Sequence, residues 1–203
     1  MEDKNLTERE SLDLIRQMIQ TAKNEQKDNG MGWIVWGWLL FLASVLTLVN
    51  LYMDWFNTFF FWNVFGIIGL LLLAFRIFQY FSGHERKKFR TYTSDLLDKL
   101  NTGFFISLIL IILSINIGVH PIYGFGLLLG LYGFWILIYG SVMNFKPSLI
   151  GAYITWGFAF GSLFAEDFMI TMLLHAVAVL CGYIIPGHMA YKEFNKVQEI
   201  GSV

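Results

Sequence analysis

The sequence predicts an all-α, polytopic membrane protein whose six transmembrane helices form three hairpins, with both termini in the cytoplasm. Hydrophobic residues make up 56% of the 203 residues, and charged residues make up 14%. The apolar residues fall into six continuous runs, without the alternation typical of barrel strands. All fourteen Lys and Arg residues lie in alternate gaps between these runs, or in the last turns before such a gap. This bias sets the orientation of membrane helices.

The length of each run indicates whether it can span the bilayer, because a helix needs about 20 apolar residues to cross roughly 30 Å of hydrocarbon. The three hairpins are predicted at 31–81, 102–143 and 144–187. The third, fifth and sixth runs are short, which local thinning of the bilayer tolerates. The predicted spans are 33–53, 59–81, 103–119, 122–143, 148–165 and 168–185.

Residues 1–30 are predicted to form a cytoplasmic amphipathic helix. About thirty polar residues precede the first apolar run, whereas a signal peptide has only a short basic region there. Thr7 and Glu10 fit a capping box. The mixed, slightly acidic charge favours docking on the protein's own cytoplasmic face or on a partner helix over binding to the membrane surface. A structural role and a regulatory contact both remain open. The apolar residues at helical spacing are Leu12, Ile15, Met18, Ile19 and Ala22.

Residues 82–101 are predicted to form a second cytoplasmic amphipathic segment, which is polybasic. Such a cluster beside a membrane helix attracts anionic lipid, at about 1 kcal/mol per basic residue near the surface. A simple topology anchor is the alternative. Nucleic acid is not an expected partner, because the net charge is -1 and the basic run is short. The predicted headgroup contacts are Arg86, Lys87, Lys88 and Arg90.

The three gaps without Lys or Arg are predicted to face the other side of the membrane. Their charged residues are Asp54, Glu166 and Asp167. The single Cys181 lies within the sixth run, so the sequence has no disulfide framework. Residues 188–203 are predicted to be a cytoplasmic tail.

His175 is the deepest ionisable residue of the predicted spans, and such residues mark functional sites by default. Asn116 and Thr155 are the polar candidates to line a ligand or transport path with it, although neither matches its depth closely. The alternative is a neutral histidine that bonds to a neighbouring helix. The sequence places no buried Asp or Glu near it, which argues against ion-coupled transport. Ser141 and Ser162 do not match its depth as a serine protease would require.

Two glycine pairs have the small-xxx-small spacing that lets membrane helices approach closely: Gly126 with Gly130, and Gly157 with Gly161. Their predicted role is helix packing.

No cofactor or metal is predicted. His84 and His188 each follow a glycine at the cytoplasmic end of a helix, but two histidines without a third ligand fall short of a metal site. The helix dipole already favours histidine at that place. The sequence contains no P-loop, HExxH, EF-hand or CxxC motif.

Three stretches of the sequence suggest a relationship. The chain has an amphipathic start at 10–15, a first span rich in Trp and Gly, and the phrase Gly-Tyr-Ile-Ile-Pro-Gly at 182–187 before a short basic tail. In these features it resembles small bacterial six-span inner-membrane proteins of unknown function. The resemblance implies a multi-pass protein of the bacterial inner (plasma) membrane and implies no activity.

The expected function is that of a non-enzymatic membrane protein that senses or scaffolds by contacting cytoplasmic partners. The alternative is a small transporter or channel for a neutral or lipid-like molecule, with His175 near its path. The expected partners are the bilayer, anionic lipid at the cytoplasmic face, a cytoplasmic protein and a second copy of the chain.

Overall fold

The computed structural model describes residues 30–81 and 92–201, and every regular element in them is helical. The all-α prediction is therefore confirmed for this part of the chain. Residues 1–29 of the helix predicted at 1–30, the cluster from Arg86 to Arg90, and His84 lie outside the described residues. The elements are α2 (Met31–Met53), α3 (Phe60–Phe81), α4 (Tyr92–Ile117), α5 (Pro121–Val142), α6 (Lys146–Leu163), α7 (Phe168–Val179), the π-helix η1 (Leu180–Ile184) and α8 (Ile185–Gly201).

Four stretches of the described chain are long and apolar enough to cross a membrane. A fifth, Phe60–Leu71 in α3, is apolar but shorter. Helix α6 is not among the four, because Lys146 and several Gly, Ser and Thr residues interrupt its apolar run. The four stretches are Met31–Met53, Leu96–Ile117, Pro121–Val142 and Phe168–Lys196, the last of which joins α7, η1 and the start of α8.

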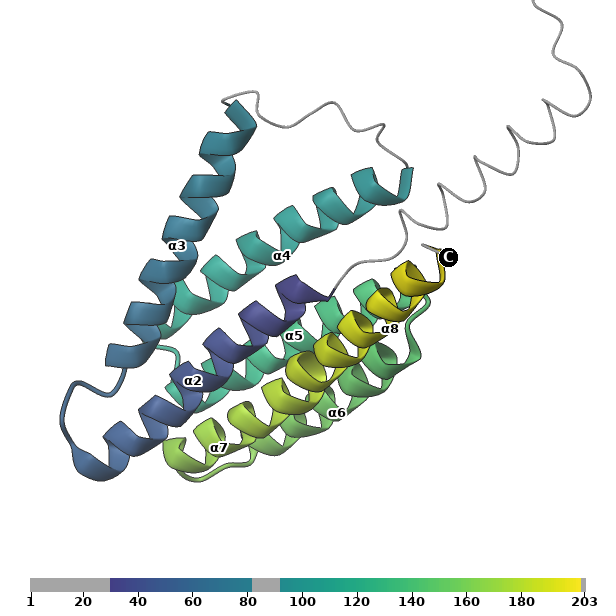
Figure 1. The fold of residues 1–203 in the computed structure, drawn as a ribbon. Helices are drawn as coiled ribbons and strands as arrows, with labels where there is room; N and C mark the ends of the chain where they lie inside the picture. The colour runs from purple at the N-terminus through teal and green to yellow at the C-terminus, as the bar shows by residue number, and fades with distance from the viewer. Residues whose placement is uncertain (1–29, 82–91, 202–203) are drawn as a thin grey trace, which may run out of the picture.

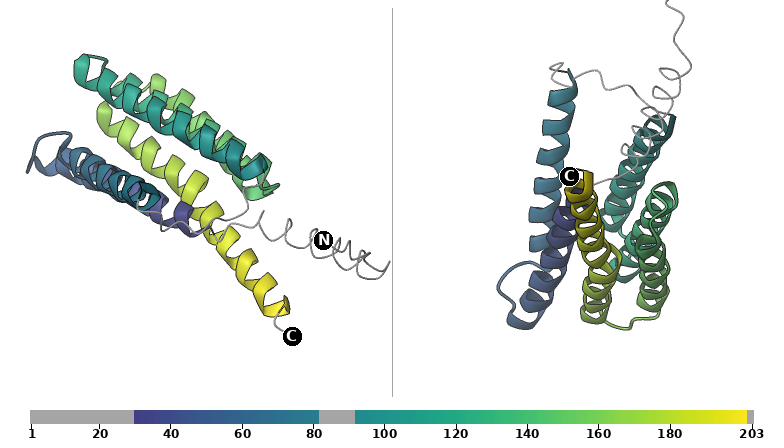
Figure 2. Two further views of the ribbon diagram at one scale, coloured as in Figure 1. Left: turned by 90° about the horizontal axis from the view of Figure 1, so that it is seen from above. Right: turned by 45° about the vertical axis from the view of Figure 1, so that its right-hand side comes forward.

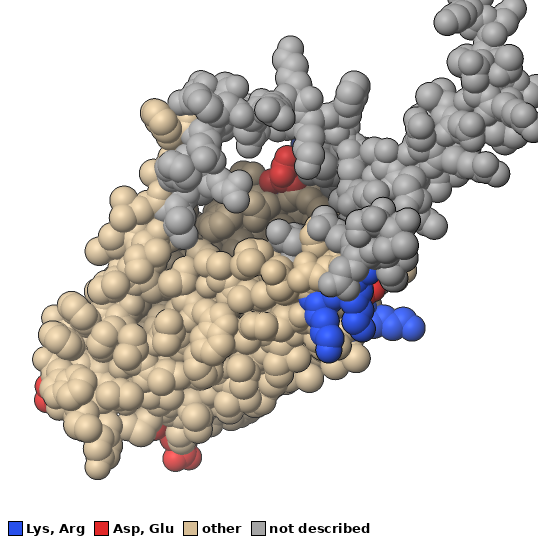
Figure 3. Space-filling view, viewed as in Figure 1, with Lys and Arg blue, Asp and Glu red and all other residues tan. Residues whose placement is uncertain are grey.

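From α2 to α7 successive helices run in opposite directions, and α8 continues the course of α7 and η1 (Figure 1). The start of α2, the end of α5, the start of α6 and the end of α8 lie at one end. We call this the basic end, because α6 begins there with Lys146 and α8 carries Lys192 and Lys196 toward it; Figure 3 shows Lys side chains gathered at this end. The α2–α3, α4–α5 and α6–α7 turns lie at the opposite end.

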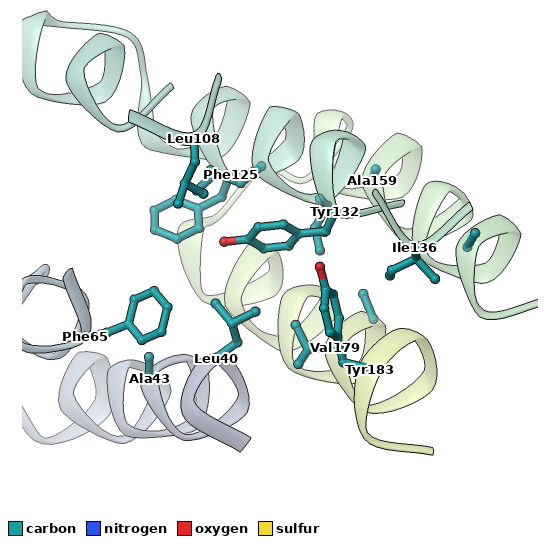
Figure 4. Close-up of a cluster of buried hydrophobic side chains, with 14 of the residues drawn as sticks. Leu40, Ala43, Phe65, Leu108, Phe125, Tyr132, Ile136, Ala159, Val179 and Tyr183 are labelled. Carbon is teal, nitrogen blue, oxygen red and sulfur yellow. The ribbon is translucent and has the colours of Figure 1, made fainter. Parts of the chain in front are cut away.

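The core lies where α2, α5, α6 and α7 pack together, with α3 and α4 against one side (Figure 2). Toward its C-terminal end α3 diverges from the bundle (Figure 1). The outer surface carries exposed large apolar side chains, among them Leu71, Leu110, Phe160 and Leu173. Lipid tails would solvate such a surface without cost. Buried side chains of the core include Leu40, Phe65, Leu108, Phe125, Tyr132, Ile136, Val179 and Tyr183 (Figure 4).

A buried amide fixes the α2–α3 turn. Asn50 Oδ1 accepts a hydrogen bond from the backbone N–H of Phe56 at 2.8 Å, and its Nδ2 donates to the carbonyl of Phe56 at 3.0 Å. Asp54 ends α2 in the left-handed conformation, with φ of 53°. The side chain of Asn50 thus supplies the partners that the turn backbone lacks.

The π-helix η1 arises from the proline that follows it. Pro186 has no N–H, and in an α-helix its ring would clash with the carbonyl of Gly182. The widened turn avoids this clash, and the N–H of Ile185 bonds to the carbonyl of Leu180 five residues earlier. Here the backbones of two helices meet: a Cβ on Gly151 of α6 would lie 3.0 Å from the carbonyl oxygen of Cys181.

Of the four glycines predicted to pack helices closely, only Gly126 lies against a neighbouring helix so tightly that a Cβ would clash. A Cβ on Gly126 would lie 2.8 Å from Leu163 Cδ2. No such contact exists at Gly130 or Gly157, where nothing lies within 4 Å of an added Cβ, and at Gly161 only Leu174 Cδ1 comes near, at 3.9 Å. The spacing identifies small residues but not the direction in which they face. Helix α6 turns Gly157 and Gly161 outward and packs through Gly151, Ala152, Thr155 and Ala159 instead.

We expect Gly151→Leu to lower the free energy of unfolding by about 2 kcal/mol, because the added side chain meets backbone atoms that cannot rotate away. Gly157→Leu, in the same helix, should leave stability unchanged or raise it, since leucine forms helix better than glycine. Equilibrium unfolding of both variants in mixed micelles measures the difference. Equal losses for the two variants would contradict this packing.

Candidate functional site

His175 lies at the centre of the bundle and is 0% exposed. Helix α7 carries it two turns beyond the N-cap residue Asp167, whose carboxylate accepts a hydrogen bond from the N–H of Met169 at 3.1 Å. This cap fixes the start of α7 and thus the depth of the imidazole.

The hydrogen-bond partner of His175 comes from the first predicted span. Ser44 Oγ lies 2.9 Å from His175 Nδ1 and 2.8 Å from the carbonyl oxygen of Leu40. A hydroxyl carries one hydrogen, so Ser44 donates to only one of these two atoms. When it donates to Leu40, the imidazole carries its hydrogen on Nδ1 and donates to Ser44. The bond joins α2 to α7 across the core.

Aromatic rings enclose the rest of the imidazole. The ring centroid of Trp62 in α3 lies 5.1 Å from that of His175, with the two rings at 90°. Phe125 and Tyr132 of α5 each place a ring centroid 5.8 Å away. The indole N–H of Trp62 donates to Met172 Sδ at 3.3 Å, one turn before His175. Four helices therefore meet at this histidine.

Two buried polar atoms have no hydrogen-bond partner within the described residues: His175 Nε2 and the hydroxyl of Tyr183. Tyr132 lies between them, with its ring 6.0 Å from that of Tyr183 (Figure 4). Beyond Tyr183 the rings continue to Trp33, at 5.1 Å, and then to Tyr139, at 4.7 Å. A packed file of rings thus leads from the histidine toward the basic end.

The two residues predicted to accompany His175 lie elsewhere. Asn116 is exposed on α4, and its Nδ2 donates to the carbonyl of Ile112 in its own helix at 2.8 Å, so its predicted place beside His175 is wrong. Thr155 is buried, but its hydroxyl donates to the carbonyl of Gly151 at 2.8 Å and lies against Gly182. The prediction took polar residues of the spans as candidates, whereas the rotation of each helix decides which of them contacts His175.

Sequence reasoning missed the polar stripe of α2. Ser44, Thr47 and Asn50 are all buried, and their three-residue spacing places them on one helix face. Polar residues at helical spacing in an apolar run were the signal that would have found them. Ser44 of this stripe, and not Asn116, contacts the buried histidine.

A pocket of about 120 Å³ opens at the basic end; we call it the basic-end pocket. The start of α2, the turn between α5 and α6, and α8 form its walls. Asn144 holds that turn in the left-handed conformation, with φ of 50°. The lining residues are Gly30, Trp33, Tyr139, Met143, Asn144, Phe145, Ser148, Pro186, Gly187, Ala190, Glu193 and Phe194.

His188 lies near this end, on the exposed side of α8. Its Nδ1 is 2.8 Å from the carbonyl oxygen of Ile184, one turn earlier. Among the residues that the structure describes, no three His, Cys, Asp or Glu side chains gather as metal ligands.

Comparison with protein-family models, with curated proteins and with solved structures gave no match for this chain.

Removal of the Ser44 hydroxyl should destabilise the bundle. We expect Ser44→Ala to lower the free energy of unfolding by about 1–2 kcal/mol, because it leaves a buried imidazole nitrogen unpaired. Thr47→Val is the matched control on the next turn: among the described residues its hydroxyl bonds to the carbonyl of Ala43 alone, so the loss should stay below about 0.5 kcal/mol. Denaturation in micelles measures both, and the opposite order would refute the central role of Ser44.

Tyr183→Phe should be neutral or stabilising, because it removes a buried hydroxyl that bonds to nothing in the described protein. Tyr153→Phe on the exposed face of α6 supplies the baseline. The measurement is the shift in thermal unfolding midpoint in detergent. A loss of more than about 1 kcal/mol relative to that baseline would show that water bonds to the Tyr183 hydroxyl.

Proposed function

We propose that this chain is a non-enzymatic six-span module of the bacterial inner membrane, with both termini in the cytoplasm, that senses or scaffolds at its basic end. One observation carries the proposal: the bundle packs closed around His175, while its pocket lies at the same end as Lys146, Lys192 and Lys196. A closed core, together with a pocket at one end of the bundle, is what we expect of a protein that binds a partner or ligand.

The orientation rests on the partition of charge. Lys146, Lys192 and Lys196 lie at the basic end, whereas the opposite turns carry Asp54, Glu166 and Asp167. Basic residues of short loops remain in the cytoplasm. The alternating helix directions and the exposed apolar flanks of the bundle support six crossings, with α3 and α6 as the two additional spans.

The proposal includes no reaction, and the hydrogen bonds of three buried hydroxyls support this. Those of Thr47, Thr155 and Ser162 each donate to a carbonyl of their own helix, at 2.7–2.8 Å. A hydroxyl that donates in this way lacks a base to activate it as a nucleophile. The exception is Ser44, whose Oγ lies 2.9 Å from His175 Nδ1, but the rings of Trp62, Phe125 and Tyr132 close around that histidine.

A small transporter or channel for a neutral or lipid-like molecule is the second candidate. The unpaired Nε2 of His175 favours it, because a passing molecule would find a hydrogen-bonding group there. The rings of Trp62, Phe125 and Tyr132 around the same histidine oppose it, since a path would have to displace them. We therefore prefer a binding function at the basic end to a transport function.

The orientation predicts which positions an impermeant reagent reaches. In a Cys181→Ser background, a single cysteine at Asp54 or Glu166 should react with a membrane-impermeant maleimide in intact cells. A cysteine at Lys146 or Lys192 should react only after lysis. Reaction at position 146 in intact cells would refute the proposed orientation.

The scaffolding function predicts that the apolar stripe at 12–22 makes the partner contact. Ile15→Glu combined with Ile19→Glu should reduce a cross-linked partner at least fivefold, while the level of inserted protein stays constant. Gln17→Glu combined with Gln20→Glu adds the same charge off that stripe and should leave the yield unchanged. In-cell cross-linking measures the yield, and equal yields for the two double variants would count against a scaffold that works through this segment.

A further inference from the structure

The basic-end pocket combines aromatic walls with one carboxylate. Trp33 and Tyr139 form one wall, with ring centroids 4.7 Å apart, and Phe145 and Phe194 contribute rings from the α5–α6 turn and from α8. Glu193 is the charged residue among the lining residues, which include no Lys or Arg. Aromatic faces beside a carboxylate form a favourable environment for an ammonium group.

The surroundings of the pocket carry the opposite charge. Lys146 follows Phe145 of the wall, and Lys192 precedes Glu193 in α8; both lysines are exposed. The described lysines at this end are seen together in Figure 3. An aromatic pocket with the exposed Glu193 among its lining residues and exposed lysines beside it matches a ligand that joins an ammonium group to a phosphate.

The position of the pocket selects a membrane lipid over a soluble molecule. It lies where α5 ends and α6 begins, which is the depth of the headgroups when these helices span the bilayer. A volume of about 120 Å³ suits a few atoms of a headgroup and not an acyl chain. Exposed apolar side chains at the same end of α2 and α8, those of Met31, Val35, Ile185 and Met189, offer a surface for the acyl chains.

We propose that the basic-end pocket binds the headgroup of an amine phospholipid, with phosphatidylethanolamine as the matching chemistry. The ammonium group lies against the aromatic wall and pairs with the Glu193 carboxylate. The phosphate pairs with Lys146 or Lys192. This inference deepens the proposed function and rests on its placing of the α5–α6 turn at a membrane surface.

The test uses the full-length protein, stripped of lipid in detergent and offered phosphatidylethanolamine and phosphatidylglycerol with identical acyl chains. Native mass spectrometry counts the lipid that stays bound. The unaltered protein should retain phosphatidylethanolamine in preference. Glu193→Gln should reduce that retention about fivefold, the loss expected for an exposed charge pair. Phe194→Leu should reduce it about two- to fivefold without a change of charge. Glu166→Gln, at the opposite end, is the matched control and should have no effect.

Three results would overturn the proposal. Equal retention of phosphatidylethanolamine by the unaltered protein and by Glu193→Gln would show that Glu193 does not bind the ammonium group. An equal loss in Glu166→Gln would show a general effect of charge. A rise in retention when Ile15 and Ile19 are both changed to Glu would make the 1–29 segment the occupant. A reversed orientation in the maleimide experiment would refute the proposed function and leave this selectivity intact, because amine phospholipid is present at both surfaces.

Discussion

The hydrogen bond between Ser44 and His175 is the interaction on which the arrangement of the bundle depends. In hydrocarbon an imidazole without a partner is costly, so the helix that carries His175 must face a hydrogen-bonding group. Ser44 supplies it and thereby fixes the rotation of α2 against α7. Trp62 and Tyr132 then pack their rings around an imidazole that is already held. Gly37 of α2 allows the helix to approach η1, because an added Cβ there would lie 2.9 Å from Tyr183 Cβ.

A second constraint acts on the continuous helical segment of α7, η1 and α8, and it shapes the pocket. Pro186 requires a widened turn, and η1 supplies it without a break in the helix. Gly151 and Gly182 then let α6 and η1 touch backbone to backbone, which fixes the course of α8 beyond the core. Because α8 brings Phe194 and Glu193 toward the start of α2, the pocket at the basic end follows from the accommodation of a proline. Backbone geometry thus places side chains that are more than 150 residues apart in the sequence.

The sequence predicts helix positions well and helix rotations poorly. Long apolar runs and their turns follow from composition, so the predicted spans agree with the observed helices to within a few residues for α2 and α5. His175 is recognisable because an ionisable residue stands out in an apolar run. Its partner is harder to recognise, since hydropathy does not report which face of a helix a residue occupies; Asn116 is a polar residue in a span, but it points outward. The basic-end pocket could not be found at all, because its walls come from segments that share no motif.

The pocket and the histidine belong to one packed assembly, and this is what a sensing function needs. Trp33 lines the pocket and also packs on Tyr183, which in turn packs on Tyr132 beside His175. These rings are almost fully buried, so Trp33 cannot shift without a response from Tyr183. A ligand changes a protein only to the extent that it favours one arrangement over another. The unpaired hydroxyl of Tyr183 lies within this chain of contacts, and a rearrangement that gave it a partner would lower its energy. The buried polar groups and the open pocket are therefore connected by one continuous series of packed rings, from Trp33 to His175.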